Sequence, residues 1–368
     1  MKIGILTHDQ AESHGACLQH YAMTQYLQAL GHEVHTLTYT RDFEYASTGD
    51  RAKFSVSLRS IPFYFREYLL KQGCSYVWTM ARKHLLLRRF NRTQFSYVSS
   101  EQPGFDAVIV GSDEVWSLQM GFNAVLFGHG IDCRRLIAYA PSFGQTDLAQ
   151  IQYHGRLDDI REGLSRFQAI STRDLHTQQL VTQLTGQSPS INCDPALLYR
   201  FDRELSALPK RTAPAYIAVY AYNSDLNEPE RVEAIRAYAR SIGAQVYAVG
   251  GYHRWCDRQI ACDPLELLAW FRDAEAVITD TFHGTIGAFL TRTPMAVYVR
   301  PTNRNKLSHL LTALQLEDRT ITDSHPLYEV FSVPLHFDTL HASLQDFRSE
   351  SGNWLKQALT EPYHREGL

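Results

Sequence analysis

A histidine lies among hydroxyl side chains in the segment 276–285, which reads AVITDTFHGT. Residues 277–279 are predicted to form a short strand, and a helix is predicted to begin near His283. The first N–H groups of a helix have no partner within the helix and lie at the positive end of its dipole, so they can bind an anion. We therefore predict an anion site whose residues are Thr281, Phe282, His283, Gly284 and Thr285.

Polar and aromatic residues also follow strands that are predicted in the N-terminal half. These residues are Ser13, His14 and Gly15 after strand 3–7, Asp113 and Trp116 after strand 105–110, and Arg173 after strand 168–171. The carboxyl ends of parallel strands meet at one edge of an α/β sheet, where such sheets bind their ligands. Structural explanations are open as well. An aspartate after Gly-Ser commonly caps a helix, and an aromatic residue near a strand end commonly belongs to the core.

The elements that must position these residues alternate between strands and helices in both halves of the chain. Strands are predicted at 3–7, 33–39, 105–110, 134–139, 168–171, 216–220, 245–249, 277–279 and 295–299, and helices at 15–30, 228–242, 264–272 and 305–314. This alternation indicates an α/β fold with two Rossmann-like domains that face a cleft. The loop after the first strand lacks the GxGxxG pattern, so a nicotinamide cofactor is not indicated.

The 368 residues suffice for two domains. We predict an N-terminal domain over 1–199 and a C-terminal domain over 200–338, with a connection at 200–214 that is rich in proline and basic residues. The amphipathic tail 339–368 is expected to pack back across the first domain.

Composition excludes several classes of function. A net charge of −3 argues against general nucleic-acid binding. No apolar run approaches the roughly 20 residues that span a bilayer. The six cysteines show no CxxC spacing and the histidines no HxH or HxxxH grouping, so neither a disulfide framework nor a metal site is predicted. We expect a cytoplasmic protein that begins directly with a strand.

The segment 51–92 differs from the rest of the chain in charge. It contains ten Lys or Arg residues and one acid, Glu67, with aromatic residues and leucines between them. A basic amphipathic helical insertion of this kind can lie on the cytoplasmic face of an anionic membrane, or can bind an acidic substrate. It can equally pack on its own domain with its charges in solvent. The sequence leaves these alternatives open.

Five motifs occur in the order found in one family. They are GACLQHYAM at 15–23, GSDEVW at 111–116, DPALL at 194–198, TDTFHG at 279–284, and the run from NRNKL at 303–307 to LQLEDR at 314–319. In this order they resemble the polysaccharide pyruvyl transferases, over roughly residues 1–320. The resemblance implies a two-domain fold like that of GT-B glycosyltransferases. It also implies transfer of the pyruvyl group of phosphoenolpyruvate onto two hydroxyls of a sugar, as a cyclic ketal.

The resemblance suggests roles for the candidate residues. The donor site would lie in the second domain, with Arg173 and Arg304 supplying positive charge and His283 acting as acid or as phosphate clamp. Asp113 would be the base that activates the sugar. The acceptor side would lie in the first domain, with the residues Ser13, His14, Gly15 and Trp116, the last stacking on the sugar. Phosphoenolpyruvate would be a co-substrate, no cofactor or metal is expected, and the acceptor would be a sugar or a lipid-linked oligosaccharide.

The sequence is also compatible with two other functions. A GT-B glycosyltransferase that uses a nucleotide-sugar donor would bind it in the same cleft of the second domain. A membrane-attached assembly subunit would act through residues 51–92 instead of through a catalytic site.

Overall fold

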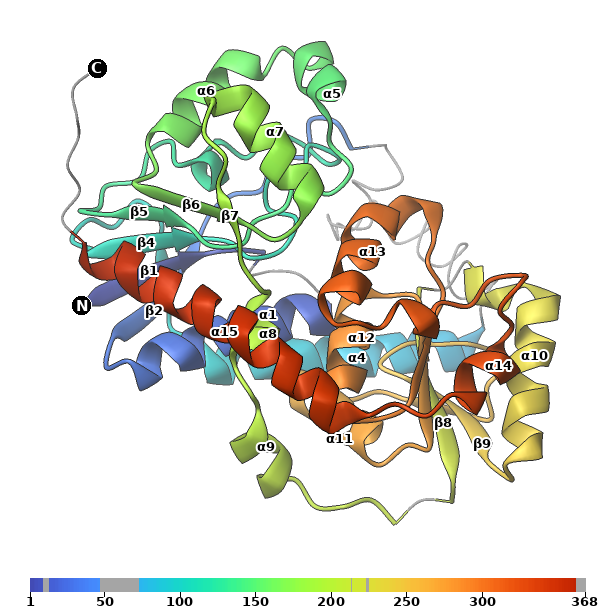
Figure 1. The fold of residues 1–368 in the computed structure, drawn as a ribbon. Coiled ribbons are helices and arrows are strands. Elements are labelled where there is room, and N and C mark those ends of the chain that lie inside the picture. The colour runs from blue at the N-terminus through green and yellow to red at the C-terminus, as the bar shows by residue number, and fades with distance from the viewer. Residues whose placement is uncertain (9–12, 47–72, 213, 223–224, 362–368) are drawn as a thin grey trace.

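The computed structural model describes residues 1–8, 13–46, 73–212, 214–222 and 225–361. Two α/β units lie side by side (Figure 1). The first contains a parallel sheet whose described strands are ordered β3-β2-β1-β4-β5-β6-β7. Their bounds are β1 Lys2–Leu6, β2 Glu33–Thr38, β3 Tyr97–Ser99, β4 Ala107–Val110, β5 Leu136–Ala138, β6 Ala169–Thr172 and β7 Ser190–Ile191.

The second unit contains a parallel sheet whose described strands are ordered β10-β9-β8-β11-β12. Their bounds are β8 Tyr216–Tyr220, β9 Gln245–Val249, β10 Arg258–Ile260, β11 Ala276–Thr279 and β12 Met295–Val297. Strands β4 and β11 are buried along their whole length, as expected of parallel strands that are covered on both faces. The predicted α/β class with two parallel sheets is confirmed.

Helices cover both sheets (Figure 1). In the first unit they are α1 His14–Ala29, α4 Cys74–Gln94, α5 Leu148–Tyr153, α6 Leu157–Ser165, α7 Leu175–Thr185 and α8 Pro195–Leu198. The connection contains α9 Asp202–Ala207. In the second unit they are α10 Pro229–Ser241, α11 Pro264–Arg272, α12 Phe282–Leu290, α13 Arg304–Ala313, α14 Leu327–Ser332 and α15 Phe337–Thr360.

Each sheet has a point at which the strand order reverses direction. In the first sheet this switch lies between β1 and β4, and in the second between β8 and β11. Ligands of open α/β sheets bind outside the carboxyl ends of the strands at such switch points. The fold therefore provides two half-sites, one in each unit.

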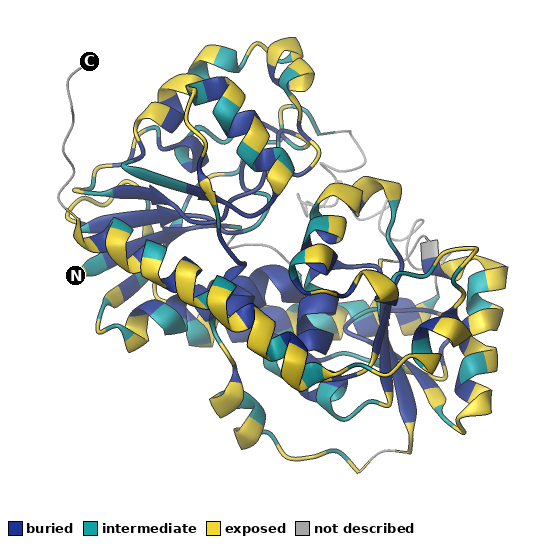
Figure 2. Cartoon of the chain, viewed as in Figure 1, coloured by how far each residue is buried: buried dark blue, intermediate teal, exposed yellow. Residues whose placement is uncertain are grey.

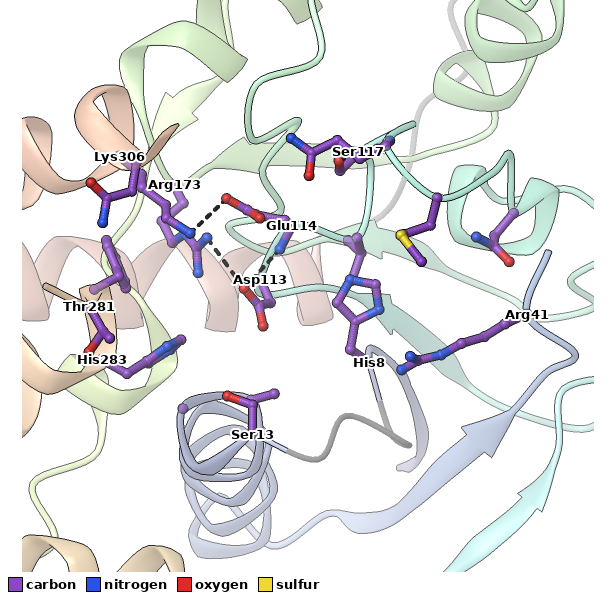
Figure 3. A pocket seen from close by; sticks show the side chains of 18 of the residues that line it. His8, Ser13, Arg41, Asp113, Glu114, Ser117, Arg173, Thr281, His283 and Lys306 are labelled. Carbon is purple, nitrogen blue, oxygen red and sulfur yellow. Dashed lines mark hydrogen bonds and ion pairs between the residues drawn. The ribbon is translucent and has the colours of Figure 1, made fainter. Parts of the chain in front are cut away.

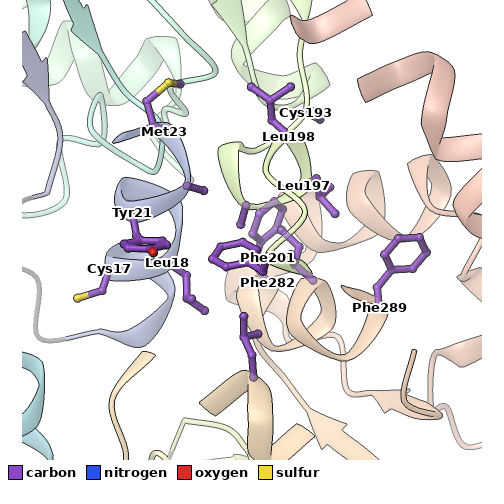
Figure 4. Close-up of a cluster of buried hydrophobic side chains, with 14 of the residues drawn as sticks. Cys17, Leu18, Tyr21, Met23, Cys193, Leu197, Leu198, Phe201, Phe282 and Phe289 are labelled. Carbon is purple, nitrogen blue, oxygen red and sulfur yellow. The ribbon is translucent and has the colours of Figure 1, made fainter. Parts of the chain in front are cut away.

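Helix α1 joins the two units. Most of its residues are buried on all sides, because it contacts α8 of its own unit and also α11 and α12 of the second. Figure 2 shows this helix in the buried colour between the sheets. Figure 4 shows Leu18 and Tyr21 of α1 near Leu197 and Phe282 in one apolar cluster, which also contains Phe271 of α11. A continuous apolar interface of this kind holds two domains in one relative orientation.

The C-terminal helix α15 runs from the second unit back to the first (Figure 1). Its Ser351 hydroxyl accepts a hydrogen bond of 2.9 Å from the backbone N–H of Cys193. The ring of Trp354 lies 6.1 Å from that of Tyr139. The chain segment 339–360 thus contacts the first sheet's own core residues.

The basic segment 51–92 lies partly outside the described residues, which resume at 73. From Cys74 to Gln94 it forms helix α4, whose Leu87 and Phe90 are buried in the core. Within the described parts of the chain, no helix combines the length and apolarity needed to cross a bilayer.

Candidate active site

A cavity of about 260 Å³ lies between the two units, close to the lower end of the usual range of small-ligand pockets, roughly 300 to 1,000 Å³. It opens where the carboxyl ends of β1, β4 and β6 face those of β8 and β11, so both switch points line it (Figure 3). The predicted site residues among those that line it are Ser13, Gly15, Asp113, Arg173, Thr281, Phe282 and His283.

A buried arginine holds two carboxylates together on the first-unit wall. Arg173, which follows β6, has its Nη1 3.0 Å from Oδ2 of Asp194 and its Nη2 3.5 Å from Oδ1 of Asp113. The guanidinium also lies over the ring of Phe282, 4.5 Å from its centre. The stacking orients Arg173 across the unit boundary, so the position of this charge depends on both domains.

His283 extends from the start of α12 toward the same cluster. Its Nε2 lies 3.5 Å from Oδ2 of Asp194, at the outer limit of hydrogen bonding. That nitrogen has no hydrogen-bond partner among the described residues. Only 12% of the His283 side chain is exposed. The ring thus faces the cavity from a dry position, next to a negative charge and with a nitrogen available to a ligand.

The electrostatics keep both carboxylates ionised. Burial alone would raise the pKa of the Asp113 carboxyl, but the charge of Arg173, and then that of His283, outweigh burial and lower it. The pKa of Asp194 is also lowered, because the charges of His283 and Arg173 exceed the effect of its burial. The site therefore contains two fixed negative charges around one fixed positive charge.

The local sequence explains which backbone N–H groups at the start of α12 remain available to a ligand. Thr281 caps the helix, because its hydroxyl accepts a hydrogen bond of 2.9 Å from the N–H of Gly284. The N–H of Thr285 donates to the carbonyl of Thr281 at 3.1 Å. Neither Gly284 nor Thr285 lines the cavity, so the prediction that they bind the donor directly is wrong. The N–H groups that remain for a ligand are those of Phe282 and His283.

Gly15 allows α1 to approach His283 closely. A Cβ built on Gly15 would lie 2.7 Å from the Cβ of His283 and would overlap its ring. The neighbouring Ser13 is the N-cap residue of α1, makes no side-chain capping bond, and lines the cavity. Helix α1 thus approaches the imidazole through its backbone instead of through a side chain.

Two residues predicted on the acceptor side are buried away from the cavity. His14 is fully buried, and its Nε2 lies 2.9 Å from the carbonyl oxygen of Cys262 in the second unit. Burial, with a smaller effect of Lys83, lowers its pKa to about 3, so the ring is neutral. His14 therefore ties the two units together, and the prediction that it binds the sugar is wrong.

Trp116 is also fully buried, in the core of the first unit. Its Nε1 donates a hydrogen bond of 2.8 Å to the carbonyl oxygen of Leu126, and its ring packs against those of Phe127 and Phe143. No face of the indole is open to a sugar. The prediction that Trp116 stacks on the acceptor is wrong, because its side chain is packed inside the core of the first unit.

The cation that α13 presents to the cavity is Lys306 instead of the predicted Arg304. Arg304 is exposed at the start of α13 and does not line the cavity. Two residues along the same helix, Lys306 does line it, with its Nζ 2.8 Å from Oε1 of Glu114. This pair joins the second unit to the first across the cavity. The correction follows from helical geometry, since residues two apart point to different faces.

Asp194, Glu114 and Lys306 are functional candidates that the sequence alone does not reveal, although all three lie within the motifs of the chain. The residues that they contact are remote in sequence, so the spacing of residues along the chain does not indicate these contacts. An aspartate before proline is typical of a helix N-cap, and Asp194 does accept a hydrogen bond of 2.9 Å from the N–H of Ala196. Its second oxygen is the one that faces Arg173 and His283.

Two doubly wound units with facing switch points define a two-domain fold of the GT-B type. UDP-GlcNAc 2-epimerase from Neisseria meningitidis, bound to UDP-GlcNAc, has this fold with a TM-score of 0.51 and 8% identity, covering 98% of this chain and 99% of that one. The spinosyn rhamnosyltransferase SpnG, complexed with thymidine diphosphate, aligns with a TM-score of 0.47 and 13% identity, covering 98% and 100%. At these identities the likeness is one of fold alone.

Sequence comparison is more specific. The family model described as polysaccharide pyruvyl transferase matches residues 14–300, most of the chain. The chain belongs to the polysaccharide pyruvyl transferase family. Membership places it among transferases that act on polysaccharides. Among curated proteins, none matches this sequence.

Proposed function

We propose that the protein transfers the pyruvyl group of phosphoenolpyruvate onto two hydroxyls of a sugar, forms a cyclic ketal and releases phosphate. The observation that carries the proposal is the constellation of His283, Asp194, Arg173 and Asp113 around one interdomain cavity. It combines an imidazole, a fixed cation and an ionised carboxylate, which this reaction requires for proton transfer and for anion binding. Family membership supports the same reaction class.

The donor is a small molecule with a phosphate and a carboxylate. We assign its anionic groups to the end of the cavity next to the start of α12, where Arg173 of the first unit and Lys306 of the second supply charge. The free N–H groups of Phe282 and His283 and the dipole of α12 favour the same anion. Arg173 and Lys306 each already face a carboxylate, so donor binding would share or exchange these ion pairs.

The proposed reaction proceeds in two additions at C2 of the enol. His283 protonates C3, which becomes the methyl group, and the first sugar hydroxyl adds to C2 as Asp113 accepts its proton. The C2–O bond to phosphate then breaks, and the leaving phosphate takes the proton from Asp113. The second hydroxyl adds to C2, closes the ring and returns a proton to His283. Each of the two hydroxyl protons is thereby accounted for, one on C3 and one on phosphate.

Asp194 is the positioning residue of this scheme. Its ionised carboxylate lies 3.5 Å from Nε2 of His283 and can stabilise the protonated ring. Asp113 is ionised as well, because Arg173 lowers its pKa, and it is therefore free to accept a proton at neutral pH. The same pairing limits its strength as a base, which suits transfer to a departing phosphate.

The test is incubation of the protein with phosphoenolpyruvate and a panel of glycans, including lipid-linked oligosaccharides. We expect phosphate release that depends on a glycan, together with a methyl signal of the ketal in the product's NMR spectrum. Neither a cofactor nor an added metal is expected to be needed. Absence of release with every glycan, together with absence of phosphoenolpyruvate binding, would contradict the proposal.

A GT-B glycosyltransferase with a nucleotide-sugar donor is the second candidate, since the fold is shared with nucleotide-sugar enzymes. Thermal shift with phosphoenolpyruvate and with a panel of sugar nucleotides separates the two. We expect stabilisation by phosphoenolpyruvate. Stabilisation by a sugar nucleotide alone would favour the glycosyltransferase.

A further inference from the structure

The first-unit end of the cavity contains a second group of cationic and donor side chains that the proposed chemistry does not use. Arg41, which follows β2, and His8, which follows β1, both line the cavity. Figure 3 shows Arg41 and His8 pointing toward one another, with Asp113 between them and His283. The donor end and the Arg41 end are therefore distinct parts of one cavity.

The polar atoms of this group lack partners. Nε and Nη2 of Arg41 and Nδ1 of His8 are buried, and none has a hydrogen-bond partner in the described chain. A buried donor without a partner is costly, and a guanidinium cannot remove the cost by losing its proton. Native proteins satisfy such groups with ordered water, an ion or a ligand, and here they line a cavity large enough to admit a ligand.

The nearby carboxylates do not fill this role. The Oδ1 of Asp42 accepts a hydrogen bond of 2.9 Å from the N–H of Glu44, and the Glu44 carboxylate pairs with Arg156 at 3.0 Å. Asp113 pairs with Arg173. Within the described residues, no ion pair with Arg41 is present. Burial lowers the pKa of His8; the negative charge of Asp113 opposes this effect and the positive charge of Arg41 adds to it, so Arg41 and His8 interact electrostatically.

We propose that Arg41 and His8 form a subsite for an anionic group on the acceptor, a carboxylate or a phosphate attached to the sugar that receives the pyruvyl group. The proposal rests on the proposed function, because it names the acceptor class of that same cavity. Arg41 presents a fork of N–H donors that matches either anion, and His8 adds a donor at its Nδ1. Asp113 lies between this anion and the phosphate and carboxylate groups of the donor. The acceptor is therefore an acidic or phosphorylated sugar.

Binding of three small probes tests the subsite without knowledge of the full acceptor. Glucuronate, glucose 1-phosphate and glucose share one ring and differ in the anion, and their affinities can be measured by saturation-transfer NMR or calorimetry. We expect one or both anionic probes to bind at least about tenfold more tightly than glucose. Arg41→Gln should abolish this preference, and Arg41→Lys should restore part of it. Arg134→Gln, at an arginine whose side chain is 85% exposed and lies outside the cavity, is the matched control.

The outcomes separate the subsite from the proposed function. Phosphoenolpyruvate affinity is measured on the same variants, and Arg41→Gln should leave it within about twofold of the wild type, since the donor anions lie at the other end. Equal binding of the three probes by the wild type would overturn the subsite while the transferase proposal stands. A loss of phosphoenolpyruvate binding in Arg41→Gln would also overturn it, because Arg41 would then belong to the donor. Anion preference through Arg41 in a protein that does not bind phosphoenolpyruvate would retain the subsite and reject the transferase.

An independent observation concerns the outer face of α4. Trp78 and Leu85 are 72% and 69% exposed, and the exposed Arg82, Arg89 and Arg92 continue the same stripe at helical spacings of three and four. The helix has no Asp or Glu. Arg82, Arg89 and Arg92 form no ion pair within the part of the chain that the structure describes. A large apolar surface and unpaired charges of one sign therefore share one helical face.

We propose that this stripe lies on an anionic lipid surface. Trp78 and Leu85 would enter the interface, and the arginines would contact the headgroups. The charge of the stripe is opposite to that of such a membrane, and its apolar members are those favoured at the bilayer boundary. This placement would bring a lipid-linked acceptor near the enzyme.

Vesicle sedimentation tests the contact with the full chain. We expect binding to vesicles that contain phosphatidylglycerol and not to pure phosphatidylcholine, with about tenfold weaker binding for the double variant Arg82→Glu and Arg89→Glu. A matched double variant, Arg134→Glu and Arg161→Glu, changes the net charge equally at exposed positions outside α4. An equal loss in both variants would reject the stripe. Absence of binding to any vesicle would also reject it and would point instead to an acidic protein partner.

Discussion

Asp194 and His283 come from different units and meet with Oδ2 3.5 Å from Nε2 in the interdomain cavity. Asp194 is fully buried and also pairs with Arg173 at 3.0 Å. The imidazole that sequence motifs identified is thus held beside a carboxylate that belongs to the other half of the molecule. Function at this site therefore depends on the relative position of the two domains.

Replacement of His283 by alanine tests its role. We expect kcat for phosphate release to fall by about 10² to 10⁴, the usual range for loss of a general acid or base. If the variant still binds phosphoenolpyruvate, His283 is the acid. If binding is lost, His283 is the phosphate clamp. The control His336→Gln changes an exposed histidine outside the cavity. An unchanged kcat in His283→Ala would remove it from the mechanism.

Lys306 and Arg304 form a matched pair on one helix. Lys306→Ala should raise the KM for phosphoenolpyruvate by about tenfold or more, because a charged donor facing the cavity is lost. Arg304→Ala should leave the KM within about twofold, since its side chain is exposed outside the cavity. Steady-state kinetics with varied phosphoenolpyruvate measures both. A larger rise in the KM for Arg304→Ala than for Lys306→Ala would show that Arg304 binds the donor instead.

Gly15→Ala should disturb the site without removing any functional group. The added methyl overlaps the ring of His283, so the imidazole or the whole unit must move. A displacement of about 1 Å can lower kcat by about 100-fold. Gly251→Ala is the control, because a Cβ there would meet its nearest atom at 3.7 Å, an ordinary contact. Equal activity of the two variants would show that the helix contact does not position His283.

Asp194→Asn should reveal a pH-dependent contribution to stability. The pKa of Asp194 is lowered in the fold, so its contribution is present above the ordinary carboxyl value of about 4 and is lost as pH falls below it. At pH 7 we expect a loss of about 3 kcal/mol in the free energy of unfolding, measured with urea. The difference from wild type should shrink below about pH 4. Asp338→Asn, whose carboxylate is 92% exposed, should differ little at any pH. A constant difference would contradict this electrostatic account.

Trp116→Phe separates the structural role from the sugar-binding one. Loss of the hydrogen bond to the carbonyl of Leu126 should reduce the free energy of unfolding by about 1 to 2 kcal/mol. The KM for the acceptor should be unchanged, because the indole does not reach the cavity. A raised KM at unchanged stability would reinstate the sugar-stacking role.

The alternation of buried strands and helices was readable from the sequence, because hydrophobic periodicity is local. It predicted the α/β class, and the order of motifs indicated the family that the comparison finds. Residues directly after the strands, such as Asp113, Arg173 and His283, were predictable as site candidates, since parallel strands place their ends at one edge.

Which way each candidate side chain points, and which residue it pairs with, were decided only by the tertiary structure. Whether His14 and Trp116 face the cavity or the interior depends on how α1 and the loop after β4 pack, and sequence spacing does not encode that. Ion pairs such as Asp194 with His283 and Glu114 with Lys306 join residues from different domains. Local sequence fixed which elements form and which residues end them. Long-range packing fixed which of those residues meet, because contact between side chains is a property of the assembled core and not of the chain.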